Sequence, residues 1–120
     1  MIKPLRYLVS ILLAVFVATV AWAGAAPLAL SDGSNAAMHN AEGIKHYEKG
    51  HWKEAYKHFN EAVQANPDAA EAHYNLALTL DKMGQHHDAA MHFKQAQDKG
   101  KDNPEIQNSG ILKAHVKMLK

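Results

Sequence analysis

The stretch that decides the fold is residues 50–67, GHWKEAYKHFNEAVQANP. Within it Ala55, Phe59 and Ala62 stand at i, i+4 and i+7, which places them on one face of a helix. The two alanines are small enough for a neighbouring helix to approach closely, and the phenylalanine ring fills the space between them. Gly50, just before this helix, favours the left-handed turn that ends a preceding helix. The stretch therefore predicts a pair of helices packed through a small-large-small stripe.

Residues 84–100, GQHHDAAMHFKQAQDKG, repeat this pattern 34 positions later. The residue types kept at that shift are Ala36/Ala70, His39/His73, Gly50/Gly84, Ala55/Ala89, His58/His92, Phe59/Phe93 and Ala62/Ala96. A period of 34 residues is typical of helix-pair repeats, in which each pair buries its apolar face against its neighbours.

These residues resemble the tetratricopeptide-repeat family over about residues 35–100. The carriers of the resemblance are Gly43 and Ala77 in the first helices, Gly50, Trp52 and Gly84 at the turns, the two Ala-Phe-Ala stripes, and Asn66-Pro67. The chain departs from the family pattern at His86, where an aromatic is expected, and at Gly100-Lys101, which replaces Asn-Pro. The resemblance implies an all-α fold, a short α-solenoid of antiparallel helix pairs.

The predicted domain covers residues 35–119, with repeat 1 at 36–69, repeat 2 at 70–102 and a capping helix at 103–119. Asn103-Pro104 starts the capping helix, since Pro is favoured in the first turn. Asp68, three residues before Glu71, predicts a capping box for the helix that follows it. The expected helices are roughly 36–49, 52–65, 69–83, 86–99 and 104–119.

The first 34 residues precede this domain. Lys3 and Arg6 followed by an uncharged apolar run to Ala23 predict a cleaved bacterial-type signal peptide over residues 1–23. An uncleaved inner-membrane anchor facing the periplasm is the alternative, because a run of about 20 apolar residues can span a bilayer. Residues 24–34, rich in small residues, predict a flexible linker. We expect an exported protein, periplasmic or secreted.

Composition excludes several classes of function. Without Lys3 and Arg6, 11 basic residues face 12 acidic ones, a net charge of −1 with histidine neutral, so nucleic acid is not expected as a partner. There is no cysteine for a disulfide or a thiolate metal site. No serine lies in a nucleophile motif, and no paired carboxylates suggest a catalytic pocket. We predict that the protein is not an enzyme and carries no cofactor.

The resemblance implies that the first helix of each unit lines a concave groove. The predicted partner-binding residues are Asn40, Ile44, Tyr47, Glu48, Glu71, Tyr74, Asn75, Leu78, Asp81 and Lys82. Tyr47 and Tyr74 are expected to form an apolar floor with the aliphatic residues; packing between helices is the alternative for both tyrosines. The family's clamp for a carboxyl-terminal peptide is absent, because only Asn75 matches its pattern.

Nine histidines are many for this length. No two stand at the i, i+4 spacing that directs both imidazoles at one metal on a helix. His51, His86 and His87 lie at successive turns and are the candidates for a Zn²⁺ or Cu²⁺ site, although surface histidines without ligand roles are commoner.

The predicted function is therefore a scaffold that binds a protein or peptide in the groove. A histidine-dependent metal-binding protein and a self-assembling subunit are the alternatives. Membrane contact is expected only through an uncleaved amino-terminal segment.

Overall fold

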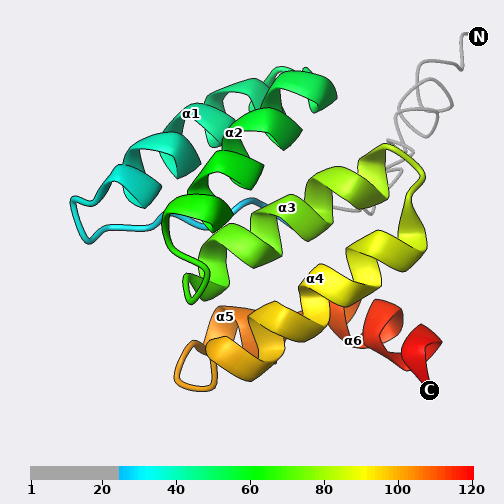
Figure 1. The fold of residues 1–120 in the computed structure, drawn as a ribbon. Helices are drawn as coiled ribbons and strands as arrows, with labels where there is room; N and C mark the ends of the chain where they lie inside the picture. Colours follow the sequence, from blue (N-terminus) through cyan, green and yellow to red (C-terminus); the bar gives the residue numbers. More distant parts are fainter. Residues whose placement is uncertain (1–24) are drawn as a thin grey trace, which may run out of the picture.

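Four helices of 13 or 14 residues, each ending in a short turn, make up most of the domain. The computed structural model of the protein describes residues 25–120 (Figure 1). The elements are α1 (Asn35–Glu48), α2 (Trp52–Ala65), α3 (Ala70–Lys82), α4 (His86–Lys99), α5 (Pro104–Gln107), α6 (Gly110–Val116) and the 3-10 helix η3 (Lys117–Leu119). No strand occurs between residues 25 and 120. The predicted all-α class is confirmed.

The helices pack in pairs, α1 with α2 and α3 with α4, and α2 against α3 joins the two pairs. Phe59 and Phe93 are fully buried at the centre of each pair, as the repeated stripe predicts. Gly43 shows how closely α1 and α2 meet, since a Cβ added there would lie 2.5 Å from the Phe59 ring. The small residues of the pattern therefore set the distance between the paired helices.

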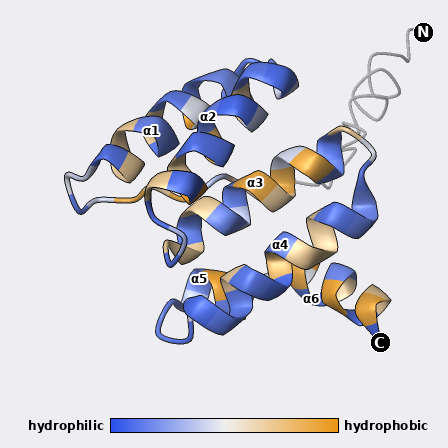
Figure 2. Cartoon of the chain, viewed as in Figure 1, coloured by the Kyte–Doolittle hydropathy of each residue, from blue (hydrophilic) through white to orange (hydrophobic). Residues whose placement is uncertain are grey.

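Helix α3 is the centre of the molecule. Its residues from Ala72 to Leu80 are all buried. Helices α1, α2 and α4, the carboxyl-terminal segment and the amino-terminal segment pack around it. In Figure 2 hydrophobic colour marks parts of α3 and α6, whereas α1 and α2 are mostly coloured hydrophilic. The second repeat thus carries more of the core than the first.

The turns within the pairs follow the sequence. Gly50 and Gly84 have φ values of +73° and +79°, the left-handed conformation that glycine adopts without strain. The predicted capping box at Asp68 is wrong: α3 begins after Ala69 with no side-chain cap. The Asp68 carboxylate instead pairs with Lys99 Nζ at 2.9 Å, and this contact lowers the pKa of Asp68.

The single capping helix expected over residues 103–119 is also wrong. Asn103 caps α5, but that helix ends at Gln107, and Ser109 starts α6 by accepting a hydrogen bond from the Leu112 amide at 3.3 Å. A serine hydroxyl that caps a helix competes with continuation of the previous helix. Ile106 and Leu112 are nevertheless fully buried, and the segment packs on α4.

Residues 25–34, called the strap below, are not the free linker that their composition predicts. The strap lies along the domain (blue to cyan in Figure 1): Leu28 packs against the main core and Leu30 against Ala62, Ala69 and Ala72. Ser34 ends it by capping α1. None of the helices in the described part of the chain has the length and hydropathy to cross a bilayer. The predicted signal peptide or anchor, residues 1–23, lies outside the described residues.

Candidate functional site

The strap and two buried asparagines form the best-defined polar site on the α1–α3 side of the molecule. Asn75 accepts a hydrogen bond from the Leu28 amide through Oδ1 at 2.6 Å and donates to the Leu28 carbonyl through Nδ2 at 2.7 Å. Asn40 donates to the same carbonyl at 2.9 Å. Asn75 Nδ2 also donates to Asn40 Oδ1 at 2.8 Å. One residue of the strap is therefore held by both of its backbone groups.

The hydrogen bonds among Asn40, Asn75 and the Leu28 backbone, called the asparagine clasp, satisfy the polar groups of two buried side chains. Asn40 and Asn75 have no exposed surface, and buried amides need hydrogen-bond partners. They come from α1 and α3, the first helices of the two units, so the clasp exists only when both units are stacked. It contacts Leu28 through backbone atoms, which every residue except proline presents in the same way. The site therefore recognises a chain segment rather than a particular side chain.

Beyond the clasp, Ile44 and Tyr47 follow Asn40 at successive turns of α1. Both are partly buried against the core, and the Tyr47 ring meets Trp52 edge to face, with centroids 5.1 Å apart. Lys82 lies over the Trp52 ring, its Nζ 5.9 Å from the centroid. Burial and, secondarily, the Asp81 carboxylate raise the pKa of Tyr47 to about 12. Tyr47 thus keeps its proton and offers a hydroxyl beside an apolar ring.

Tyr74 does not belong to the groove floor, contrary to the prediction. It is 3% exposed, its ring packs edge to face on Phe93, and its hydroxyl is 2.9 Å from Ser109 Oγ. Burial raises its pKa despite the bond to Ser109. Leu78, 1% exposed, is likewise a core residue. Packing between helices, the alternative left open for the tyrosines, is correct for Tyr74.

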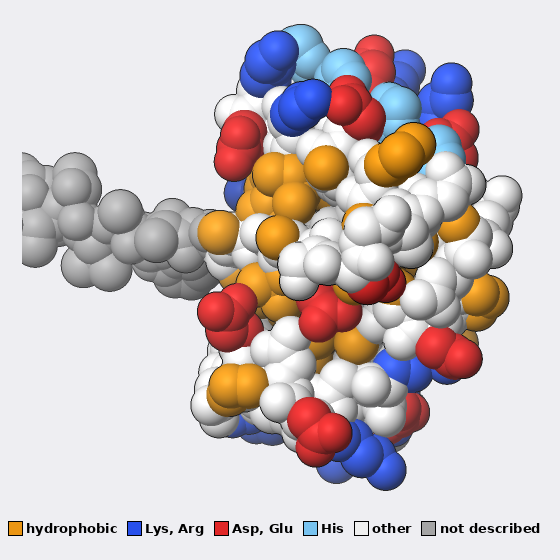
Figure 3. All heavy atoms as spheres, turned by 90° about the vertical axis from the view of Figure 1, so that its left-hand side faces the viewer, with side chains coloured by type: hydrophobic (Ala, Val, Ile, Leu, Met, Phe, Trp, Pro, Cys, Tyr) orange, Lys and Arg blue, Asp and Glu red, His pale blue; other side chains and the backbone are white. Residues whose placement is uncertain are grey.

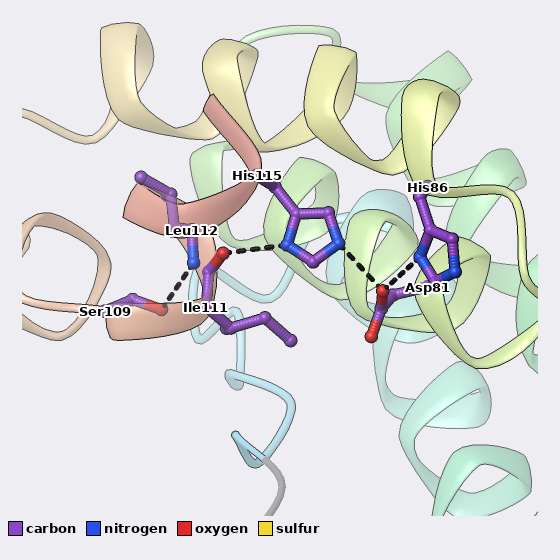
Figure 4. A network of polar contacts seen from close by, with 6 residues as sticks. All are labelled: Asp81, His86, Ser109, Ile111, Leu112 and His115. Atoms are coloured by element: carbon purple, nitrogen blue, oxygen red, sulfur yellow. Dashed lines mark hydrogen bonds and ion pairs between the residues drawn. The ribbon is translucent and has the colours of Figure 1, made fainter. Parts of the chain in front are cut away.

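The charged residues predicted to form a rim, Glu48, Glu71, Asp81 and Lys82, do not share one set of contacts. Glu71 accepts a hydrogen bond from Asn103 Nδ2 at 3.0 Å and so faces the start of α5. Asp81 lies between two imidazoles, those of His86 and His115 (Figure 4). Glu48 and Lys82 are exposed, as a rim requires.

The histidines form pairs that follow the repeat. His73 and His92 stack with centroids 5.4 Å apart and Nδ1 atoms at 3.1 Å, and burial lowers the pKa of both. His39 and His58, their counterparts in the first repeat, stack at 6.3 Å. Glu61 adds a carboxylate to the first pair, 3.0 Å from His39 Nδ1.

The three histidines predicted as metal candidates have separate neighbours. His51 packs its ring on His46, with centroids 5.7 Å apart. His86 bonds to Asp81, and His87 is exposed. His51, His86 and His87 therefore have different neighbours and do not form one cluster.

Three residues that matter for the site escaped the sequence analysis. Leu28 lies in a stretch whose composition is typical of linkers. The apolar residues Leu28 and Leu30, which follow Pro27, were a signal that this stretch packs against the domain. Trp52 was identified only as a turn aromatic. His115 was part of a helix expected to be continuous, and no local pattern places it beside Asp81.

Figure 3 shows the face on which the described chain begins. Hydrophobic side chains gather in its middle, next to the start of the described residues, and histidines gather with charged side chains along its upper edge. Four histidines of the first helix pair and its turn, His39, His46, His51 and His58, have rings that neighbour one another. This face thus combines an apolar centre with a polar border.

Comparison with known proteins bears on the first repeat and the start of the second. A family model of the TPR repeat matches residues 43–84, which run from the middle of α1 to the turn after α3. No curated protein and no solved structure matches the chain.

Proposed function

We infer from the match of a TPR-repeat family model to residues 43–84 that the chain holds a segment of another protein along α1 and α3. Repeats of this family generally mediate protein–protein interaction and form non-enzymatic scaffolds. The finer proposal concerns the α1–α3 face: a partner segment displaces the strap from the asparagine clasp and is held there by its own backbone.

The observation that carries this proposal is the asparagine clasp on Leu28. Paired bonds to one residue's N–H and C=O are the contacts by which an added segment joins an existing structure, while neighbouring surfaces select side chains. The support is that the chain's own strap, which is not helical at Leu28, makes these bonds. Because Asn40 and Asn75 bond to Leu28 through its backbone atoms alone, a partner segment of different sequence can make the same bonds.

Side-chain selection would fall to the surface next to the clasp. Tyr47 and Trp52 supply aromatic area, which commonly anchors interfaces, and Lys82 supplies a positive charge beside them. These groups favour a partner segment that carries both an apolar residue and a carboxylate.

The test is site-specific photo-crosslinking of the full-length protein in its own cells. A benzoylphenylalanine replaces either Tyr47, on α1 beside the clasp, or Tyr56, a matched tyrosine on α2 that is 37% exposed. We expect covalent adducts with a partner protein from position 47 and few from position 56. Equal adducts at the two positions, or adducts at position 56 alone, would contradict groove binding.

We also propose that the protein works outside the cytoplasm, either free in the periplasm or secreted, or anchored in the inner membrane and facing the periplasm. The support is the sequence of residues 1–23 alone. Mass spectrometry of the native protein tests it: a chain that begins at Gly24 supports cleavage and export, and a mass that includes Met1 argues for the anchor.

A further inference from the structure

Three potential metal ligands converge at the junction of α3, α4 and α6. Asp81 is the last residue but one of α3, His86 starts α4 and His115 lies near the end of α6. Asp81 Oδ1 is 2.8 Å from His86 Nδ1 and 2.8 Å from His115 Nε2. The three atoms lie within 4.8 Å of one another, and Figure 4 shows both imidazoles directed at the carboxylate.

The second nitrogen of His115 fixes the orientation of its ring. His115 Nδ1 is 2.9 Å from the Ile111 carbonyl, which can only accept, so Nδ1 carries the proton. A neutral His115 then presents the lone pair of Nε2 to the Asp81 carboxylate, also an acceptor. The contact is favourable only with a positive charge between them, either a second proton on the ring or a cation. A ligand histidine that donates its other N–H to a backbone carbonyl is the usual arrangement in metal sites.

The repeat architecture does not require these polar residues. Thirty-four positions earlier, the places of Asp81 and His86 are held by Tyr47 and Trp52, whose rings pack edge to face. The second repeat has replaced that aromatic contact by a carboxylate and an imidazole, and His115 joins them from the next segment. By contrast, the His39/His58 pair recurs as His73/His92 and so is explained by packing between the paired helices.

We propose that Asp81, His86 and His115 bind one divalent first-row transition-metal ion of the Zn²⁺ class. Two imidazoles and one carboxylate suit such an ion, with remaining positions open to water or to a partner's ligand. Ligand distances near 2.0–2.2 Å would require the two 2.8 Å contacts to open by a few tenths of an ångström. His86, 56% exposed at the start of its helix, can make that adjustment. The bound ion would tie α6 to the second repeat.

The experiment is calorimetric titration of the untagged, chelator-treated full-length protein with ZnCl₂, accompanied by thermal melts in ZnCl₂ or MgCl₂. Wild type should bind Zn²⁺ and melt at a higher temperature with Zn²⁺ than with Mg²⁺. His86→Ala should weaken this site's affinity at least about tenfold, the lower range for disturbing a metal site's surroundings. His87→Ala removes the adjacent exposed histidine and should bind as wild type does.

A second variant separates metal binding from folding. His115→Gln removes a proposed ligand whose ring also packs on Phe93. A loss of Zn²⁺ binding in this variant therefore supports the proposal only if its metal-free melt resembles that of wild type. His39→Ala, in the other histidine pair, should leave the affinity of the proposed site unchanged. No Zn²⁺ binding by wild type, or equal binding by wild type and His86→Ala, would overturn the proposal; the second outcome would place any bound ion away from Asp81, His86 and His115. A partner interaction that persists in His86→Ala would leave the proposed groove function intact.

Discussion

Replacement of Asn75 by alanine tests the asparagine clasp directly. The amide of Asn75 makes three hydrogen bonds, two with the backbone of Leu28 and one with Asn40. At about 1 kcal/mol net for each bond, Asn75→Ala should lower the free energy of unfolding by about 3 kcal/mol. The alanine also leaves Asn40, which is fully buried, with one partner fewer.

The loss has an upper limit, because the strap can detach. Once the Leu28 backbone reaches water, its groups are hydrated again, and the cost becomes that of undocking the strap. Two readouts therefore matter. Urea unfolding gives the change in free energy, and hydrogen exchange of the Leu28 amide shows whether the strap has left the groove: protection in the wild type and fast exchange in Asn75→Ala are expected.

Asn35→Ala is the matched control. Asn35 is exposed at the start of α1, and the change should stay within about 0.5 kcal/mol of wild type. A loss below about 1 kcal/mol for Asn75→Ala, with the Leu28 amide exchanging fast already in the wild type, would refute the clasp.

Three further predictions concern the core and the buried histidines. Gly43→Ala places a Cβ 2.5 Å from the Phe59 ring and should cost about 1–3 kcal/mol in urea unfolding, whereas no cost would mean that α1 and α2 are not so close. Phe59→Ala and Phe93→Ala should each cost about 3–5 kcal/mol, measured by circular dichroism melts; unchanged midpoints would contradict the repeat register. Burial lowers the pKa of His73 and His92 below 6.5, so the folded state binds fewer protons than the unfolded chain in that range. Stability should accordingly be complete above about pH 6.5 and fall as the pH drops below it, and a double change of these histidines to Gln should flatten that dependence.

The candidate site could be predicted from the sequence only in part. Asn40 and Asn75 lie in α1 and α3, the first helices of the two units, where the resemblance places them; that a partner binds them stays a prediction. Their role was not predictable, since the segment that they hold lies 12 and 47 residues away along the chain. Tyr74 was assigned to the groove by its place in the repeat, but the break at Ser109 brings a hydroxyl to it and buries it. Whether a repeat position is open or covered depends on what packs over it.

The helix pairs follow from local sequence alone. Residues 50–67 and their counterpart 34 positions later carry small alanines around a phenylalanine, and glycines at the turns adopt the left-handed conformation that ends each first helix. These are local requirements of spacing and backbone geometry, so local residues suffice to specify them. Long-range packing, by contrast, places the strap on the α1–α3 face and brings Asp81, His86 and His115 to one point. Both depend on contacts between segments far apart in the chain, and such contacts arise when apolar surfaces of separate elements are buried together.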